Sequence, residues 1–422
     1  MADFDVLDVR LHGHSIGTLT RLGRDRIVFA FDPAYADDPA RATLSLSFKD
    51  PFGHLITDIP PTRTWAPPFF ANLLPEGPLR DYLARAAGID PRREFPLLAT
   101  LGQDLPGAVA VVPVGGGRDP VIRTGAHQSR HRVRDRATPD AAFEPMPAPL
   151  PALRFSLPGV QPKLSAAMSA NDRLTIPAGG IGGSWIVKFP SAAFPGLPEQ
   201  EHSMMTLAGR VGIDVPETRL VPVDSIESLP RGMGLGRGHA LAIRRFDRLA
   251  DGTRVHVEDF AQVLGTHPEQ KYVKAGYRDI VEVIGREVGD DAVAEFIRRL
   301  VFCMLIGNGD AHLKNWALIY PDRCAPALAP AYDLVSTLPY LDDDRMALRW
   351  VDEVHRFADV SEELLARLAA KARLPRRPVV MAGRETVERF MEVWGGEKVA
   401  LEISRGVVEA IEANLGRVPL VG

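Results

Sequence analysis

Apolar residues between positions 293 and 305 recur at the spacing of one helix face. They fall at i, i+3, i+4, i+7, i+8, i+11 and i+12, as on a buried helix. This face comprises Val293, Phe296, Ile297, Leu300, Val301, Met304 and Leu305. Gly307 ends the pattern, and the polar stretch GNGDAHLKNW (307–316) follows. The run WALIY (316–320) predicts a short strand, and a second apolar stretch leads to AYDLVST, which carries Asp333.

The first 117 residues show a different pattern. Strand-like runs such as DRIVFAF (25–31) and ATLSLSF (42–48) alternate with turn residues. A helical pattern then begins after Pro75 and ends near Gly88, because proline favours a helix start and glycine a helix end. We therefore expect residues 1–117 to form a small α+β domain.

The remaining chain divides into three regions. Residues 118–150 are rich in Arg and Pro with little periodicity, which predicts a linker. Its Arg cluster could contact nucleic acid or an acidic partner, although a solvated linker is favoured. Residues 151–248 combine strand-like pieces, including GSWIVKF and HALAIRRF, with one helix near 199–212, whereas residues 249–422 are mostly helical.

Composition narrows the function classes. The 422-residue chain has a net charge of −4, which gives no general basic field of the kind that nucleic acid attracts. Its two cysteines imply neither a disulfide framework nor a zinc site, and we expect Cys303 to pack inside the apolar helix. The start of the chain lacks a signal-peptide pattern, and no stretch approaches 18 uninterrupted apolar residues. We therefore expect a soluble, cytoplasmic protein with no membrane association.

The polar stretch after the helix has a spacing that suggests chemistry. Asp310 and Asn315 are five positions apart, as are the base and the metal-binding Asn of kinase catalytic loops. Phosphoryl transfer needs a carboxylate that accepts the proton of the attacking hydroxyl and oxygen ligands that hold Mg²⁺. Asp310 suits the first role, and Asn315 and Asp333 suit the second. A plain polar loop is the alternative, because this spacing also arises by chance.

A kinase site also needs a lysine on a strand to contact the nucleotide phosphates. SWIVKFP supplies Lys188, and Glu201 early in the next helix is a candidate ion-pair partner. The alternatives are an edge-strand lysine that reaches water and a glutamate that stabilises its own helix through the dipole.

Upstream, FSLPGVQPKLS (155–165) places Gly159 between Ser156 and Lys163. A flexible backbone with hydroxyls and a cation could cradle phosphate. The stretch matches neither a Walker A sequence nor a G-x-G-x-x-G loop, so an ordinary turn is the alternative.

Taken together, these stretches resemble the HipA family of bacterial toxin serine/threonine kinases. The matching stretches are FANLLPEGPLRDYL, SLPGVQPKLS, IVKFP, EQEHSMMTLAGRVGIDVPETRL, IRRFDR, GNGDAHLKNWALIY and AYDLVST. The resemblance covers nearly the whole chain. It implies an α+β, bilobal protein-kinase-like fold with an N-terminal α+β subdomain and a mostly helical C-terminal lobe, and it implies ATP and Mg²⁺ as cofactors.

The resemblance also implies residue roles. Asp310 would be the catalytic base, Asn315 and Asp333 the metal ligands, Lys188 the lysine on the ATP phosphates, and Ser156 the site of autophosphorylation. The other residues assigned to the nucleotide site are Gly159, Gln161, Lys163, Glu201, Phe246, Asp247, His312 and Lys314. Within the interlobe linker RRFDR, Phe246 would lie near the adenine and Asp247 near the ribose.

The family further implies partners. Its usual partner is a small helix-turn-helix antitoxin, HipB, which binds operator DNA, so this chain would meet DNA through that partner. Known family targets include aminoacyl-tRNA synthetases, and their phosphorylation leads to growth arrest or persistence. A phosphate on Ser156 would switch the enzyme off.

Two departures from the family pattern stand out. Ala311 replaces the glycine that commonly follows the catalytic Asp, and Arg244 stands where the interlobe linker often begins with Glu. Alanine is small enough that we expect no loss at the first position, while Arg244 leaves the adenine-side contact open.

Two other classes remain open. A small-molecule kinase of the aminoglycoside-phosphotransferase type has a similar H-G-D-x-x-x-x-N loop, but such kinases lack the upstream S-x-x-G-x-Q-x-K loop and the N-terminal domain. A pseudokinase that acts only as a corepressor is disfavoured because nothing obliges a scaffold to keep Lys188, Asp310, Asn315 and Asp333.

Overall fold

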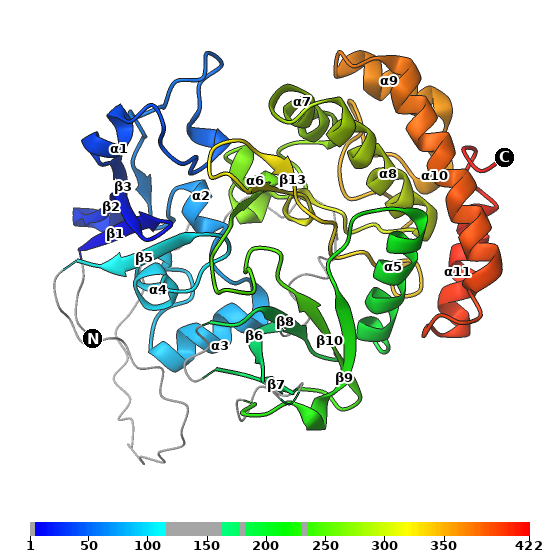
Figure 1. The fold of residues 1–422 in the computed structure, drawn as a ribbon, viewed down its shortest axis with the longest axis horizontal. Coiled ribbons are helices and arrows are strands. Elements are labelled where there is room, and N and C mark those ends of the chain that lie inside the picture. Colours follow the sequence, from blue (N-terminus) through cyan, green and yellow to red (C-terminus); the bar gives the residue numbers. More distant parts are fainter. Residues whose placement is uncertain (1–4, 115–162, 170, 172, 178–181, 230–234) are drawn as a thin grey trace, which may run out of the picture.

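The computed structural model describes residues 5–114, 163–169, 171, 173–177, 182–229 and 235–422. Three antiparallel sheets and the helices around them make up the described part of this mixed α+β fold (Figure 1). The predicted linker at 118–150 lies outside the described residues. No helix in the described part of the chain is both long enough and apolar enough to cross a membrane.

The first sheet belongs to the N-terminal region and has the strand order β4-β3-β2-β1-β5. Its strands are β1 (Val6–Leu11), β2 (His14–Leu22), β3 (Arg26–Phe31), β4 (Thr62–Arg63) and β5 (Val109–Pro113). The helices of this region are α1 (Pro33–Asp37), α2 (Pro68–Ala71), α3 (Gly77–Ala87) and α4 (Glu94–Leu101), of which α1 packs on β2 and α4 on β5. Alternate residues of β1 are buried, so one face of the sheet builds a core of its own.

The helix predicted between Pro75 and Gly88 is α3, and Gly88 closes it with a left-handed φ of 67°. The strand predicted at 42–48 is wrong. Leu46–Phe48 form a single 3₁₀ turn, because side chains bind this backbone in place of a neighbouring strand. Ser45 Oγ accepts the Ser47 N–H at 3.1 Å, and the carboxylate of Glu258 accepts the Leu46 N–H at 3.0 Å.

The second sheet lies in the middle of the chain and has the order β7-β6-β8-β10-β9. Its strands are β6 (Lys163–Met168), β7 (Leu174–Thr175), β8 (Trp185–Lys188), β9 (Thr218–Pro222) and β10 (His239–Arg244). Helix α5 (Leu197–Val211) covers β9 and β10 and also contacts the C-terminal helices (Figure 1). This helix is the one that the sequence predicts near 199–212.

The C-terminal region is mostly helical, as expected, and adds a third sheet. Strands β11 (His256–Asp259), β12 (Ala317–Tyr320) and β13 (Ala327–Leu328) form it. The helices are α6 (Phe260–Val263), α7 (Tyr277–Glu287), α8 (Asp290–Ile306), α9 (Glu362–Lys371), α10 (Arg376–Glu397) and α11 (Arg405–Leu415). Helices α7, α10 and α11 surround α8 (Figure 1), and every residue of its predicted apolar face is buried. Cys303 also packs in this core, where burial raises the pKa of its thiol to about 12.

A buried carboxyl joins the N-terminal region to the third sheet. Glu258 of β11 accepts hydrogen bonds from Ser45 Oγ at 2.5 Å, from the Leu46 N–H and from the Tyr320 hydroxyl. Burial raises the pKa of Glu258 to about 7, although these three donors oppose the shift. The protonated carboxyl is therefore the form that the folded protein favours below neutral pH.

This raised pKa predicts a pH dependence of stability. Glu258 binds more protons when folded than when unfolded, so its contribution is complete below its ordinary pKa of 4.5 and is lost as the pH rises through about 7. We expect Glu258→Gln to lack this loss. Relative to wild type, the variant should gain up to about 3 kcal/mol between pH 4.5 and 7. Urea unfolding at several pH values measures this, with the exposed Glu269→Gln as control. Parallel profiles for wild type and Glu258→Gln would contradict it.

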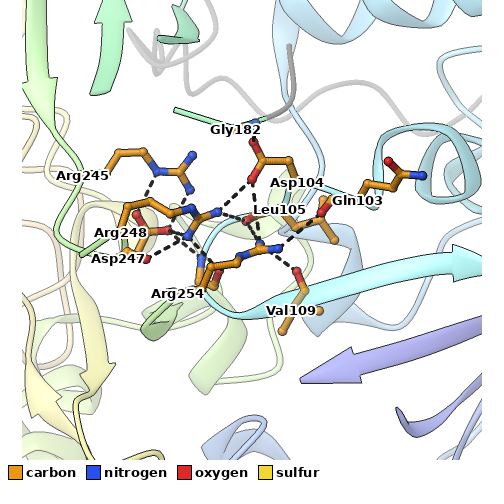
Figure 2. Close-up of polar contacts among 10 residues, drawn as sticks. Gln103, Asp104, Leu105, Val109, Gly182, Arg245, Asp247, Arg248 and Arg254 are labelled. Atoms are coloured by element: carbon orange, nitrogen blue, oxygen red, sulfur yellow. Dashed lines mark hydrogen bonds and ion pairs between the residues drawn. The ribbon is translucent and has the colours of Figure 1, made fainter. Parts of the chain in front are cut away.

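Five charged side chains connect the N-terminal region to the segment after β10 (Figure 2). Asp247 Oδ1 accepts the Arg245 Nε–H at 2.9 Å, and Oδ2 accepts from Arg245 Nη2 at 2.8 Å and Arg248 Nη1 at 2.9 Å. Arg248 Nη2 continues to Asp104 at 2.9 Å, and Arg254 Nη2 lies 4.0 Å from the same carboxylate. Burial alone would raise the pKa of Asp247, but the two adjacent guanidinium groups outweigh it and lower the pKa.

This network changes the role of Asp247. Both of its oxygens already accept hydrogen bonds from protein donors, including the Gly107 N–H at 2.8 Å. The geometry therefore does not favour the ribose contact that the resemblance assigns to it. We assign Asp247 instead to the connection between the interlobe linker and the N-terminal region.

Gly107 makes this connection possible. Its φ is +70°, and an added Cβ would lie 2.7 Å from Val257 N and 3.0 Å from His256 Nδ1. Its carbonyl accepts hydrogen bonds from Arg248 Nη1 and Arg254 Nε, each at 2.9 Å. An L side chain here would be strained in conformation and would separate the two regions.

We expect Gly107→Ala to destabilise the fold by about 2–5 kcal/mol, from left-handed strain plus overpacking. The matched control is Gly252→Ala, whose φ is +84° and whose Cβ would meet nothing within 4 Å. That control should lose about 1–2 kcal/mol. Chemical denaturation measures both, and equal losses would show that close packing at Gly107 contributes nothing.

Candidate active site

The polar turn starts from a rigid support. Helix α8 ends at Gly307, whose φ of 69° is left-handed and whose N–H bonds back to Cys303 and Met304. A Cβ on Gly307 would lie 2.2 Å from Leu338 Cδ1, so the chain after Asp333 packs directly on this helix end. Thr337 Oγ1 accepts the Gly309 N–H at 2.9 Å and donates to the Gly307 carbonyl at 3.1 Å. The turn is therefore fixed from both sides.

Asn308 connects the two predicted catalytic segments. Its Oδ1 accepts the Asp310 N–H at 3.0 Å, and its Nδ2 donates to the Asp333 carbonyl at 3.2 Å. Asp310 itself is buried, and the Tyr272 hydroxyl donates to its Oδ1 at 2.5 Å. These contacts hold the Asp310 carboxylate in one orientation.

Asn315 and Asp333 lie on the same small pocket, which Asn308 also lines. The Oδ1 of Asn315 is buried, and within the described part of the chain it has no hydrogen-bond partner. Asp333 has a left-handed φ of 56°, a conformation that costs energy for a residue with a side chain. A buried acceptor without a donor beside a strained aspartate is an arrangement that a hard cation would satisfy.

This donor set fits Mg²⁺. The ion takes oxygen ligands, and proteins usually supply one or two of them while water and phosphate supply the rest. The described residues contain no cluster of three or more His, Cys, Asp or Glu side chains that could hold a metal without further ligands. Asn315 and Asp333 match the case in which the protein supplies two oxygen ligands and substrate phosphates complete the coordination.

A buried lysine faces this pocket from the second sheet. Lys188 Nζ donates to Glu201 Oε1 at 2.6 Å and also to Asp333 Oδ1. The pairing of β6 with β8 sets Lys163 directly opposite Lys188. Burial alone would lower the pKa of Lys188, but Asp333 and Glu201 raise it, so the lysine is charged. Burial likewise opposes ionisation of Asp333, yet Lys188 and Lys163 hold the Asp333 pKa well below its usual range.

The other predicted residues of the turn differ in their surroundings. His312 is buried, and burial lowers its pKa well below the ordinary value, so the ring is neutral. Its Nδ1 accepts the Lys314 N–H at 3.3 Å, and its ring stands edge-on to Tyr272 at 5.0 Å. Lys314 Nζ donates to Glu76 of the N-terminal region at 2.6 Å. The geometry therefore places Lys314 at the N-terminal region and not at the pocket of Asn315 and Asp333.

A larger cavity opens beside the turn. It has a volume of about 480 Å³ and is lined by Tyr272, Gly309, Thr337 and residues 340–346, together with Arg356. Tyr272, which donates to Asp310, therefore connects this cavity to the carboxylate. The volume of the cavity is large enough to hold a peptide side chain.

Comparison with known proteins decides the family. Residues 155–394 match the HipA-like C-terminal domain, and residues 7–112 match the HipA N-terminal domain. A relative from Sinorhizobium fredii, "Putative kinase Y4dM", is 52% identical and is covered over 98% of its length by the whole of this chain.

The chain belongs to the HipA family.

Further relatives agree with this membership. "Putative kinase Y4mE" of the same organism is 34% identical, with 82% of this chain and 80% of that protein covered. The "Serine/threonine-protein kinase toxin HipA" of Shewanella oneidensis is 28% identical over 68% and 66% of the two chains. A solved complex of Shewanella oneidensis MR-1 HipA with HipB and operator DNA matches with a TM-score of 0.70 at 23% identity, over 97% and 96% of the chains. The predicted HipA resemblance and its α+β fold are thus confirmed.

Not every residue that the HipA resemblance assigns can be placed. Ser156, Gly159 and Gln161 lie outside the described residues. Phe246 is half-buried, with its ring centroid 6.0 Å from that of Tyr332. Their roles in nucleotide binding stay predictions.

Sequence reasoning missed several residues that hold this HipA-family site together. Asn308 lies inside the quoted motif and could have been found as a second amide of the turn. Lys271 and Tyr272 precede Asp310 by almost forty positions, and no local pattern connects them. Glu76 belongs to the stretch FANLLPEG, which carries the family resemblance but no predicted role.

Proposed function

We propose that this chain is an ATP-dependent protein serine/threonine kinase of the HipA toxin type that uses Mg²⁺. The observation that carries the proposal is the convergence of Asp310, Asn315, Asp333 and the Lys188–Glu201 pair on one place. The names of the relatives support a kinase. Bound ATP would supply the phosphoryl group, and Mg²⁺ would neutralise part of the negative charge on the phosphates.

The residues of the chain would divide the work as follows. Asp310, oriented by the Tyr272 hydroxyl, would accept the proton of the attacking hydroxyl. Asn315 and Asp333 would hold the metal ion through their oxygens. Lys188, which Asp333 and Glu201 keep charged, would exchange its contact with Asp333 for one with the nucleotide phosphates and so leave Asp333 free for the metal. Neutral His312 accepts the Lys314 N–H at Nδ1, so its buried Nε2, which has no partner among the described residues, carries the proton and would donate one hydrogen bond to the phosphates.

We further propose that the acceptor is a serine or threonine of another protein, entering through the cavity beside Gly309. Family membership points to an aminoacyl-tRNA synthetase as the target and to growth arrest or persistence as the outcome. Comparing phosphoproteomes of cells that express the wild type or the Asp310→Asn variant tests this. The target should carry a phosphate in the first cells and lack it in the second. Identical phosphoproteomes would contradict the proposal.

Self-inactivation at Ser156 is part of the proposal. A phosphate there adds close to two negative charges and needs hydrogen-bond donors of its own, in a loop proposed to lie over the ATP phosphates. Repulsion should therefore displace the loop and stop catalysis. Mass spectrometry of the 155–165 peptide after incubation with Mg·ATP should find the phosphate, and a Ser156→Asp variant should be inactive. An unmodified peptide from an active enzyme would rule this switch out.

The proposed organisation and partner follow from the family. We propose an N-terminal subdomain at 1–117, a linker at 118–150, an ATP-binding lobe at 151–248 and a catalytic lobe at 249–422, acting in the cytoplasm. A HipB-like helix-turn-helix antitoxin would bind the chain and connect it to DNA. Co-expression with the product of the adjacent gene should copurify the two proteins. A kinase without such a partner would be an unpaired member of the family.

A further inference from the structure

Glu76 extends from the N-terminal region toward the catalytic turn. It precedes helix α3 but does not cap it, because its side chain makes no hydrogen bond to the first turn of that helix. Its carboxylate instead accepts hydrogen bonds from two lysines of the C-terminal region, from Lys314 Nζ at 2.6 Å and from Lys271 Nζ at 2.7 Å. Burial alone would raise the pKa of Glu76, but the two ammonium groups hold it well below its usual range. The bridge is therefore ionised.

Each of the two lysines is next in sequence to a residue of the proposed site. Lys314 precedes Asn315, and its carbonyl accepts the hydroxyl of Tyr332, the neighbour of Asp333, at 2.8 Å. Lys271 precedes Tyr272, which donates to Asp310 at 2.5 Å. One carboxylate thus fixes both the metal-ligand end of the turn and the residue that orients the base.

Burial and further hydrogen bonds hold the groups around Glu76 in place. Lys271 is buried, and Lys314 also donates to the Asn72 carbonyl at 3.1 Å. Asn72 Nδ2 in turn donates to the Thr266 carbonyl at 2.8 Å, so the segment around Glu76 is anchored independently of its charge. Without the carboxylate, two ammonium groups would face each other across a partly buried space, and both backbone segments would relax away from it.

We propose that Glu76 is a positioning residue for phosphoryl transfer, through which the N-terminal region holds the catalytic turn in its active geometry. The inference rests on the proposed function and adds a role for a part of the chain that supplies none of the groups placed at the nucleotide. A displacement of about 1 Å at the base or the metal ligands lowers a rate by about 10²-fold. Loss of Glu76 should therefore act on kcat and spare the affinity for ATP.

The test compares Glu76→Gln with a matched control, Glu287→Gln. Glu287 also bridges the two regions, through Lys49 Nζ at 2.6 Å, but its partners do not adjoin the site. We expect Glu76→Gln to lower kcat by about tenfold or more with the KM for ATP within about twofold of wild type. Glu76→Asp keeps the charge on a shorter side chain, and its kcat should lie between those of Glu76→Gln and wild type. The control should match wild type, and an unchanged kcat in Glu76→Gln would overturn the proposal.

Hydrogen exchange gives a readout that does not depend on catalysis. Amides of the peptide 307–316 should exchange faster in Glu76→Gln than in wild type and in Glu287→Gln. If the wild type transfers no phosphate, the proposed function fails, and hydrogen exchange alone then tests the role of Glu76. Equal exchange of the 307–316 amides in wild type and Glu76→Gln would overturn that role. Asp259 Oδ2 stays 4.0 Å from Lys314 and should help the variant to fold. If Glu76→Gln nevertheless unfolds, Glu76→Asp decides: a kcat lowered about threefold or more with an unchanged KM supports the proposal, and a kcat equal to wild type overturns it.

Discussion

Replacing Asp310 with Asn should lower phosphoryl transfer by about 10²–10⁴-fold, because general-base catalysis is worth that much and an amide cannot take the hydroxyl proton. Fold and nucleotide binding should survive. The amide has the shape of the carboxylate, and its Oδ1 can still accept the Tyr272 hydroxyl. The Asp310 N–H keeps its bond to Asn308. Initial rates with a protein acceptor, together with an ATP titration, measure both expectations.

The control for this variant is Asp251→Asn, the same change at an exposed turn. It should leave the rate unchanged. If Asp310→Asn keeps more than about a tenth of the wild-type rate, proton transfer to Asp310 is not the step that the geometry suggests. If it loses the rate together with ATP affinity, Asp310 belongs to the binding site instead.

The second large effect is expected at Asp333. Asparagine tolerates the left-handed φ of 56° there, so Asp333→Asn should keep the backbone while removing the charge. A metal ion supplies several kcal/mol of charge stabilisation, and we expect the variant to lose about 10²-fold or more in kcat/KM. Its affinity for ATP should no longer increase when Mg²⁺ is added. Titrations with and without Mg²⁺ measure this directly.

Lys188→Met separates the two roles at this place. Lys188 contacts both Glu201 and Asp333, and its removal should weaken ATP binding with and without Mg²⁺ alike, because the lost contact is to phosphate. Asp333→Asn should differ from wild type mainly when Mg²⁺ is present. If Asp333→Asn binds and turns over Mg·ATP normally, the metal site lies elsewhere.

Local patterns in the sequence were enough to find the core of the candidate site. The apolar face of α8, its end at Gly307 and the spacing from Asp310 to Asn315 are short-range features, and each depends on helix or turn geometry that neighbouring residues determine. Lys188 and Glu201 are thirteen positions apart on a strand and the next helix, and the structure joins them at 2.6 Å. Such pairs follow from the order of elements.

Contacts between segments that are distant in the sequence could not be predicted from local patterns. Nothing near Glu76 indicates that it faces Lys271 and Lys314, because that depends on how the N-terminal sheet packs on the catalytic turn. The same holds for Asp247, whose pairing with arginines no local pattern indicates. The false strand at 42–48 has this cause too, since Glu258 lies more than 200 positions away.

Three of the contacts between the N-terminal region and the rest of the chain involve buried or closely packed groups. Glu258 is bound by Ser45 and Leu46, Gly107 sits among the arginines after β10, and Glu76 bridges two lysines of the catalytic side. Two of these contacts lie at elements that carry site residues or the interlobe linker. The region is therefore placed to influence catalysis as well as stability.

Asp310, Asn315, Asp333 and Lys188 are proposed to form one phosphoryl-transfer site. The most direct measurement incubates the purified chain with γ-labelled ATP and a cell lysate and follows label in protein serine and threonine, with and without Mg²⁺. We predict Mg²⁺-dependent labelling by the wild type, and labelling reduced by at least about 10²-fold for Asp310→Asn and Asp333→Asn. No labelling by the wild type, or labelling by either variant equal to that by the wild type, would contradict this site.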